Sequence, residues 1–250
     1  MRRCKQDTMS LSGHLEELRR RLIFCTVAVL GAAVLGFAFV DKLRWILTRP
    51  AGNLELVFIS PPEALMANFR LAFIAGLILA MPFVLYQFMA FVLPALYKHE
   101  KKVIIPVVFM MVLFFFLGAA FAYFIAFPLT IRFLMKFSSD AVSPMFTISK
   151  YLTFATTFIF AFGLVFQMPL VFYALGRLRV VNARFLRTYR KHALLLVLVI
   201  SALLTPPDVL SQLMMAVPLM LLYELGIMLV VLSQGKAERG QKERNNRLMS

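Results

Sequence analysis

Long charge-free stretches alternate with short segments rich in Lys and Arg along the 250-residue chain. About 20 consecutive apolar residues are enough for a helix to cross the hydrocarbon core of a bilayer. Four intervals without Asp, Glu, Lys or Arg are long enough to do so: 22–40, 71–97, 103–131 and 151–176. The pattern therefore predicts at least four membrane-spanning helices.

The last apolar block, 193–235, contains only two charged residues, Asp208 and Glu224. Within it, the sequence Thr205-Pro206-Pro207-Asp208 has the composition of a turn, which predicts a helical hairpin. The half before this turn gives only ~18 Å of helix at ~1.5 Å per residue, against ~30 Å of hydrocarbon. We therefore expect this helix to begin earlier, near Tyr189, in combination with local thinning of the bilayer.

The predicted fold is an all-α integral membrane protein, a single domain over 1–250 with six spans, the fifth and sixth of them short. The segment 41–68 is expected to hold interfacial helical pieces, with Trp45 at the headgroup level. Prolines within spans remove backbone hydrogen bonds and can bend helices, so we expect kinks. The expected spans are about 22–40, 69–93, 103–127, 151–175, 190–205 and 212–232, followed by a tail, 233–250.

Composition supports the membrane class, because 61% of the residues are hydrophobic and only 16% are charged, against about 45–50% and 25% in soluble domains. Of the 27 Lys and Arg, 20 lie in the N-terminal segment, the C-terminal tail and the second and fourth loops. The positive-inside rule then places both termini in the cytoplasm, with the chain in the inner membrane. The formal charge of +15 is explained by topology and anionic lipid headgroups, and a nucleic-acid partner is not expected.

Enzymatic chemistry is not expected from this sequence. His14, His99 and His192 lie far apart, and the sequence contains no metal-ligand spacing, phosphate-binding loop or nucleophile elbow. We therefore predict no metal site and no cofactor.

An amphipathic helix is predicted at the N-terminal end, with Leu11, Leu15, Leu18 and Leu22 on one face. The i,i+4 spacing pairs Glu16 with Arg20 and Glu17 with Arg21. The ordinary interpretation of such a segment is a surface helix whose charges balance each other.

A second charged segment follows the second span, where Glu100 stands among Lys98, Lys101 and Lys102. The ordinary interpretation is a solvated loop acid screened by its neighbours. The alternative is that Glu17 and Glu100 face each other at the cytoplasmic surface and accept cationic groups of a partner.

Five sequence fragments occur in a familiar order: His14-Leu15-Glu16-Glu17-Leu18-Arg19, Pro94-Ala95-Leu96-Tyr97-Lys98-His99-Glu100-Lys101-Lys102, Phe121-Ala122-Tyr123-Phe124, Phe127-Pro128 and Leu204-Thr205-Pro206-Pro207-Asp208. Together they resemble the TatC family over essentially the whole chain. The resemblance implies a receptor for signal peptides with consecutive arginines, which helps to export folded proteins using the proton-motive force. It also implies an oligomeric complex with single-span TatA-type and TatB-type subunits.

The resemblance further assigns roles to residues. Acids at the positions of Glu17 and Glu100 would bind the signal peptide, because a carboxylate matches the planar fork of a guanidinium better than it matches an ammonium group. The residues expected around this signal-peptide site are Phe91, Gln87, Arg19 and Leu15.

A second set of residues is implied at the outer turn, where Thr205, Gln212 and Asp208 would dock the single-span partners, or alternatively cap the turn. Many family members carry Glu in the fourth span where this chain has Gln167, so a titrating acid is not required there. Glu224 is expected to be a buried acid in the last span.

The alternative function is a secondary transporter of a small molecule or ion. It would predict inverted repeats and charged groups at mid-membrane. The sequence contains no repeat, and the only acids within the predicted spans are Glu224 and, at a span end, Asp208, which favours the receptor.

Overall fold

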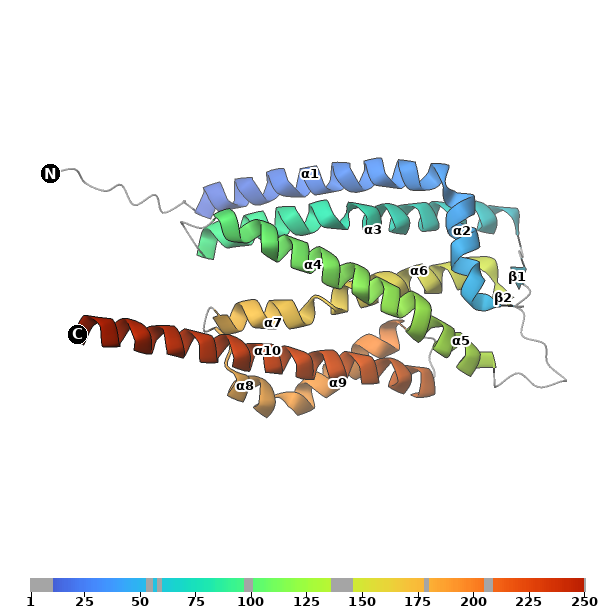
Figure 1. Ribbon diagram of the computed structural model, residues 1–250. Coiled ribbons are helices and arrows are strands. Elements are labelled where there is room, and N and C mark those ends of the chain that lie inside the picture. Colours follow the sequence, from blue (N-terminus) through green and yellow to red (C-terminus); the bar gives the residue numbers. More distant parts are fainter. Residues whose placement is uncertain are drawn as a thin grey trace. The chain divides into compact units, whose positions relative to one another are not determined.

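The computed structural model describes residues 11–52, 56–57, 60–96, 101–135, 146–177, 180–204 and 209–249 (Figure 1). Nearly all of these residues are helical, as the apolar pattern predicted. The described residues belong to two compact units, one within 1–43 and 68–112 and the other within 44–67 and 113–250.

The first unit consists mainly of two long helices, together with the first residues of two others. Its elements are α1 (Leu11–Ala38), the start of α2 (Val40–Thr48), most of α3 (Pro61–Leu96) and the start of α4 (Lys101–Phe121).

Small residues bring α1 and α3 into backbone contact. A Cβ atom added at Gly76 would collide with main-chain atoms of Ala33, and one added at Gly36 would lie 2.9 Å from the carbonyl oxygen of Ala72. In a membrane the hydrophobic effect does not drive helices together, because lipid tails are as apolar as the side chains. Helices associate instead through close van der Waals packing at small residues. The two helices are antiparallel, because residues further along α1 contact residues earlier in α3. The contacts, in order along α1, are Arg21 with Gln87, Ala33 with Gly76, Gly36 with Ala72 and Phe37 with Phe69.

The second unit contains the remaining elements. After the end of α2 come the short η1 (Arg49–Ala51) and the strand β1 (Leu56–Val57), and α4 continues through a π-helical turn, η2 (Ala122–Ala126), into α5 (Phe127–Met135). The later elements are β2 (Phe146–Thr147), α6 (Ile148–Val165), α7 (Met168–Arg177), α8 (Ala183–Thr188), α9 (Arg190–Leu204) and α10 (Val209–Met249).

Phenylalanine rings form the core where α4, α5 and α6 meet. Phe115, Phe127, Phe158 and Phe162 have no exposed surface. The ring of Phe158 lies 5.9 Å from that of Phe127 and 4.8 Å from that of Phe162 between centroids. Gly163 makes room for Phe115, because a Cβ there would lie 2.6 Å from its ring. Aromatic packing at these distances adds to the burial of apolar area.

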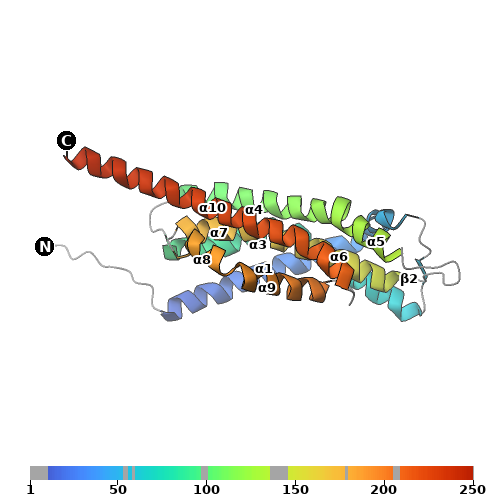
Figure 2. The same cartoon turned by 90° about the horizontal axis from the view of Figure 1, so that it is seen from below.

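The C-terminal part of this unit is organised around α10, which runs beside α7 (Figure 2). The ring of Phe172 on α7 lies edge-on to Tyr223 on α10, with 5.7 Å between centroids. The hydroxyl of Tyr223 donates to the carbonyl oxygen of Leu186 on α8 over 2.8 Å. These contacts tie α7, α8 and α10 together.

Five helical stretches in the described part of the chain are long and apolar enough to cross a membrane: Leu15–Ala38, Pro62–Phe91, Ile105–Met135, Ile148–Gly176 and Met215–Leu232. They correspond to five of the six predicted spans. The remaining prediction, 190–205, falls on α9, whose 15 residues give ~22 Å of helix. This helix begins at Arg190, close to the expected start at Tyr189.

Several local features differ from the sequence prediction. The predicted span 151–175 consists of two helices, α6 and α7, and α6 ends at Val165. In a continuous helix the ring of Pro169 would clash with the carbonyl oxygen of Val165, which lies four residues before it. The helices instead continue through Pro82, Pro106 and Pro218. The π-helical turn η2 was not predicted, and neither were α8 and the parallel pairing of Leu56 with Phe146.

The helical pieces predicted for 41–68 are present as α2 and η1. Their position at the membrane interface stays a prediction. The predicted tail, 233–250, continues α10 as far as Met249, which agrees with the high helix propensity of its Lys, Arg, Glu and Gln residues.

Candidate functional site

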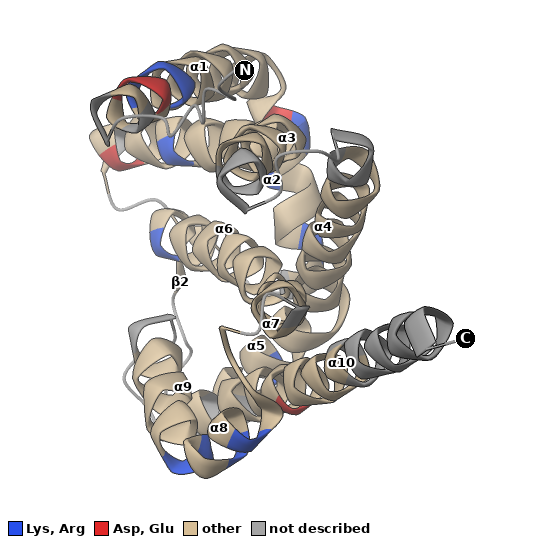
Figure 3. Cartoon of the chain, turned by 90° about the vertical axis from the view of Figure 1, so that its left-hand side faces the viewer, with Lys and Arg blue, Asp and Glu red and all other residues tan. Residues whose placement is uncertain are grey.

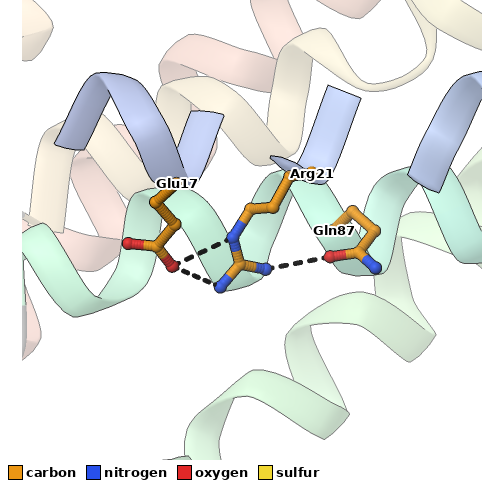
Figure 4. A network of polar contacts seen from close by, with 3 residues as sticks. All are labelled: Glu17, Arg21 and Gln87. Carbon is orange, nitrogen blue, oxygen red and sulfur yellow. Dashed lines mark hydrogen bonds and ion pairs between the residues drawn. The ribbon is translucent and has the colours of Figure 1, made fainter. Parts of the chain in front are cut away.

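A polar network joins the beginning of α1 to the later part of α3 (Figure 4). Arg21 donates from Nε and Nη2 to Oε1 of Glu17, over 3.0 and 2.6 Å. Its Nη1 donates to Oε1 of Gln87 over 2.9 Å. One guanidinium therefore holds a carboxylate and an amide from two helices at once.

The positions of these three residues follow from the helices. The i,i+4 spacing places Glu17 and Arg21 one turn apart on α1, as predicted, and the antiparallel packing brings Gln87 of α3 opposite Arg21. The side chains of Arg21 and Glu17 are 23% and 27% exposed. Because they are partly shielded from water and meet side-on, we expect the upper end of the ~0.2–1 kcal/mol of an exposed pair.

The neighbouring charges are arranged differently. The predicted pair of Glu16 and Arg20 is not found in the described part of the chain. The guanidinium carbon of Arg20 lies 5.5 Å from the centroid of the Phe24 ring instead, a cation–π contact within the same helix. The side chain of Glu16 is exposed.

The other residues predicted for the signal-peptide site are distributed around this network. Phe91 is half-buried and lies one turn beyond Gln87 on α3. Leu15, 66% exposed, and Arg19 point outward from α1. Glu100 lies outside the described residues. The structure thus brings Glu17 and Gln87 together through Arg21.

The residues predicted to dock partner subunits are described only in part. Gln212 donates from Nε2 to the carbonyl oxygen of Leu198 over 2.9 Å, which joins α10 to α9. Thr205 and Asp208 lie outside the described residues. The docking role of this group stays a prediction.

The two polar residues predicted inside spans have different surroundings. Gln167 is buried at the junction of α6 and α7, and its Nε2 lies 3.5 Å from the carbonyl oxygen of Gly163. Glu224 is less enclosed by the chain than predicted: its side chain is 36% exposed and accepts from Nη2 of Arg190 over 2.7 Å. Its place within the membrane stays a prediction. Arg190 is the first residue of the short α9, and the hairpin of α9 and α10 brings it to the acid on α10.

Lys and Arg gather on α8 and at the beginning of α9, near the acid of α10 (Figure 3). This basic group, Arg184, Arg187, Arg190 and Lys191, belongs to the fourth loop of the charge count. The ion pair with Glu224 therefore links the start of α9 to α10.

Sequence reasoning missed three side-chain anchors. The contact of Arg21 with Gln87 spans 66 positions, and no local spacing signals it. Tyr123 and Tyr151 donate to the carbonyl oxygens of Ile46 and Leu47, over 2.7 and 2.9 Å. A tyrosine in an apolar span is the available signal, because a buried hydroxyl needs a partner.

The acceptor groups of this network suit a cation. In the described part of the chain, no group of three or more His, Cys, Asp or Glu side chains is placed to hold a metal ion. A partly shielded carboxylate with a neighbouring amide oxygen suits a guanidinium. Fold and site together define a multi-span helical membrane protein with a guanidinium-binding group at the start of its first helix.

Comparisons with known proteins identify the family. The family model for the Sec-independent protein translocase protein (TatC) matches residues 13–218. The chain is similar to TatC of Carboxydothermus hydrogenoformans, with 41% identity over 94% of this chain and 98% of that protein, and to TatC of Aquifex aeolicus, with 39% identity over 94% and 100%. A crystal structure of the twin-arginine translocase receptor TatC matches with a TM-score of 0.83 and 39% identity, over 88% of this chain and 99% of the other. The chain belongs to the TatC family of Sec-independent protein translocase proteins.

Proposed function

We propose that this chain is the signal-peptide receptor and core subunit of a twin-arginine translocase. It binds signal peptides with consecutive arginines at the cytoplasmic face of the inner membrane, with both of its termini on that side. It assembles with single-span TatA-type and TatB-type subunits into an oligomeric complex. The complex exports folded proteins using the proton-motive force, and the chain itself catalyses no reaction.

The observation that supports this proposal is the guanidinium already bound at Glu17. Two N–H groups of Arg21 reach one carboxylate oxygen, and a third reaches the amide of Gln87. A lysine ammonium has no planar fork and cannot reproduce this side-on arrangement. The same acceptors therefore suit an arginine of a signal peptide.

The second arginine of the peptide is assigned to Glu100 on the resemblance to the family. Phe91, half-buried one turn from Gln87, is assigned to the apolar residues that follow the arginines. Leu15 and Arg19, on the exposed side of α1, are assigned to the rim of the site. Partner subunits are assigned to the outer turn, with Thr205, Gln212 and Asp208.

The proposal is tested by photo-crosslinking a twin-arginine signal peptide to the full-length protein in membranes. Glu17→Gln keeps the size and the hydrogen-bonding capacity of the side chain but removes its charge. We expect at least about tenfold weaker binding, which corresponds to ~1.4 kcal/mol.

Glu16→Gln is the matched control, because it removes the same charge from the neighbouring, exposed position of α1. It should bind the peptide within about twofold of the wild type. Equal crosslinking of wild type and Glu17→Gln would overturn the proposal, and an equal loss in both variants would reduce it to a general effect of charge.

A further inference from the structure

The acceptor proposed for the signal peptide is occupied by a residue of the same chain. Both hydrogen bonds from Arg21 to Glu17 end on Oε1, and the third bond takes Oε1 of Gln87. Arg21 thus makes the contacts that a ligand arginine would need (Figure 4).

An incoming guanidinium meets a like charge at this point. If Arg21 stayed in place, two guanidinium groups would share one carboxylate, and their repulsion in a partly shielded site would weaken binding. If Arg21 swings away, the entering guanidinium inherits its acceptors, and the number of hydrogen bonds is unchanged. Arg21 can move toward solvent, because its side chain is 23% exposed and has several rotatable bonds.

We propose that Arg21 is an internal stand-in for a signal-peptide arginine: it fills the subsite formed by Glu17 and Gln87 in the free receptor, and the peptide binds by exchanging with it. This inference rests on the proposed function. It assigns Gln87 as the second acceptor of the ligand guanidinium and makes Arg21 a competitor of the ligand.

A tethered competitor has a defined effect on affinity. It lowers the fraction of receptor with an open subsite, so the apparent dissociation constant rises by the same factor for every cationic ligand. The preference for arginine over lysine stays with Glu17 and Gln87. Arg21 thus raises the peptide concentration needed for binding without changing which peptide is preferred.

The inference is tested with Arg21→Gln in the full-length protein, using a twin-arginine peptide and its twin-lysine counterpart. Loss of the stand-in should tighten the binding of both peptides by the same factor, roughly fivefold for a pair of this exposure. Arg21→Lys keeps the charge but loses the fork, and its affinity should fall between those of the wild type and Arg21→Gln.

Arg20→Gln is the control for charge, because it removes one cation from the adjacent position, where the guanidinium lies over Phe24 and not at Glu17. The stand-in requires that Arg21→Gln bind at least about threefold more tightly than Arg20→Gln. Thermal unfolding of each variant checks that the fold is kept.

The opposite result is equally informative. If Arg21 orients Glu17 for a ligand that uses the second carboxylate oxygen, Arg21→Gln will bind as Arg20→Gln does or more weakly, which overturns the inference. Weak binding by Glu17→Gln together with such a result would leave the proposed function standing. Unchanged binding by Glu17→Gln would instead remove the proposed function itself.

Discussion

The contact between α1 and α3 at Gly76 gives a quantitative prediction. In Gly76→Ala the new Cβ would lie 2.5 Å from Cα of Ala33 and 2.8 Å from the carbonyl carbon of Ala32, where ordinary contacts are 3.4–4 Å. The colliding atoms belong to the backbone, so no side chain can rotate away. The helices must therefore separate by at least about 0.9 Å, the difference between 3.4 and 2.5 Å, because the nitrogen of Ala33 would lie closer still.

A gap of this size forfeits about a quarter to a half of each dispersion contact along the seam, and overpacking of a close-packed site costs about 1–3 kcal/mol. Gly31→Ala is the matched control, because nothing lies within 4 Å of a Cβ at that position on α1. Both substitutions gain the same helix propensity, up to ~1 kcal/mol. The difference between the two variants thus isolates the collision.

The assay is reversible unfolding of the purified protein in detergent micelles, followed by far-ultraviolet circular dichroism. We expect Gly76→Ala to be about 1–3 kcal/mol less stable than Gly31→Ala. Stabilities that agree within ~0.3 kcal/mol would refute the backbone contact, and with it the antiparallel register that brings Gln87 to Arg21.

Two further predictions concern the second unit. Tyr151→Phe leaves the carbonyl oxygen of Leu47 without its buried donor and should cost about 1–3 kcal/mol in unfolding free energy. Tyr123→Phe, which removes an exposed donor, should cost less, and the reverse order would contradict the burial assigned to these hydroxyls. Arg190→Gln removes the cation that pairs with the carboxylate of Glu224. A double-mutant cycle with Glu224→Gln should therefore give a favourable coupling energy of about 0.5–1 kcal/mol. A coupling energy of zero would show that the pair adds nothing to stability.

The sequence predicted the helices because its strongest signal, charge-free length, is also the dominant energetic constraint in a membrane. The same signal says nothing of how helices pair. The α1–α3 contact depends on Gly76 meeting Ala33, and no local pattern separates this glycine from Gly31, which touches nothing within 4 Å. The sequence also does not show which proline breaks its helix: the helix is interrupted before Pro169, whereas Pro82 and Pro218 lie in continuous helices.

The candidate site was predictable to a similar extent. Helical spacing is sufficient to pair Glu17 with Arg21, and the resemblance to the family supplied Gln87. Their meeting through one guanidinium required the tertiary fold. For Glu224, composition alone suggested a buried charge, whereas the short α9 places Arg190 within 2.7 Å of it.

The proposed function requires that Glu17 recognise a guanidinium and not merely a positive charge. The most direct measurement compares the dissociation constants of twin-arginine and twin-lysine peptides for the wild type and for Glu17→Gln. We expect the wild type to prefer the arginine peptide by about tenfold or more and Glu17→Gln to lose most of this preference. A preference that survives unchanged in Glu17→Gln would contradict this requirement.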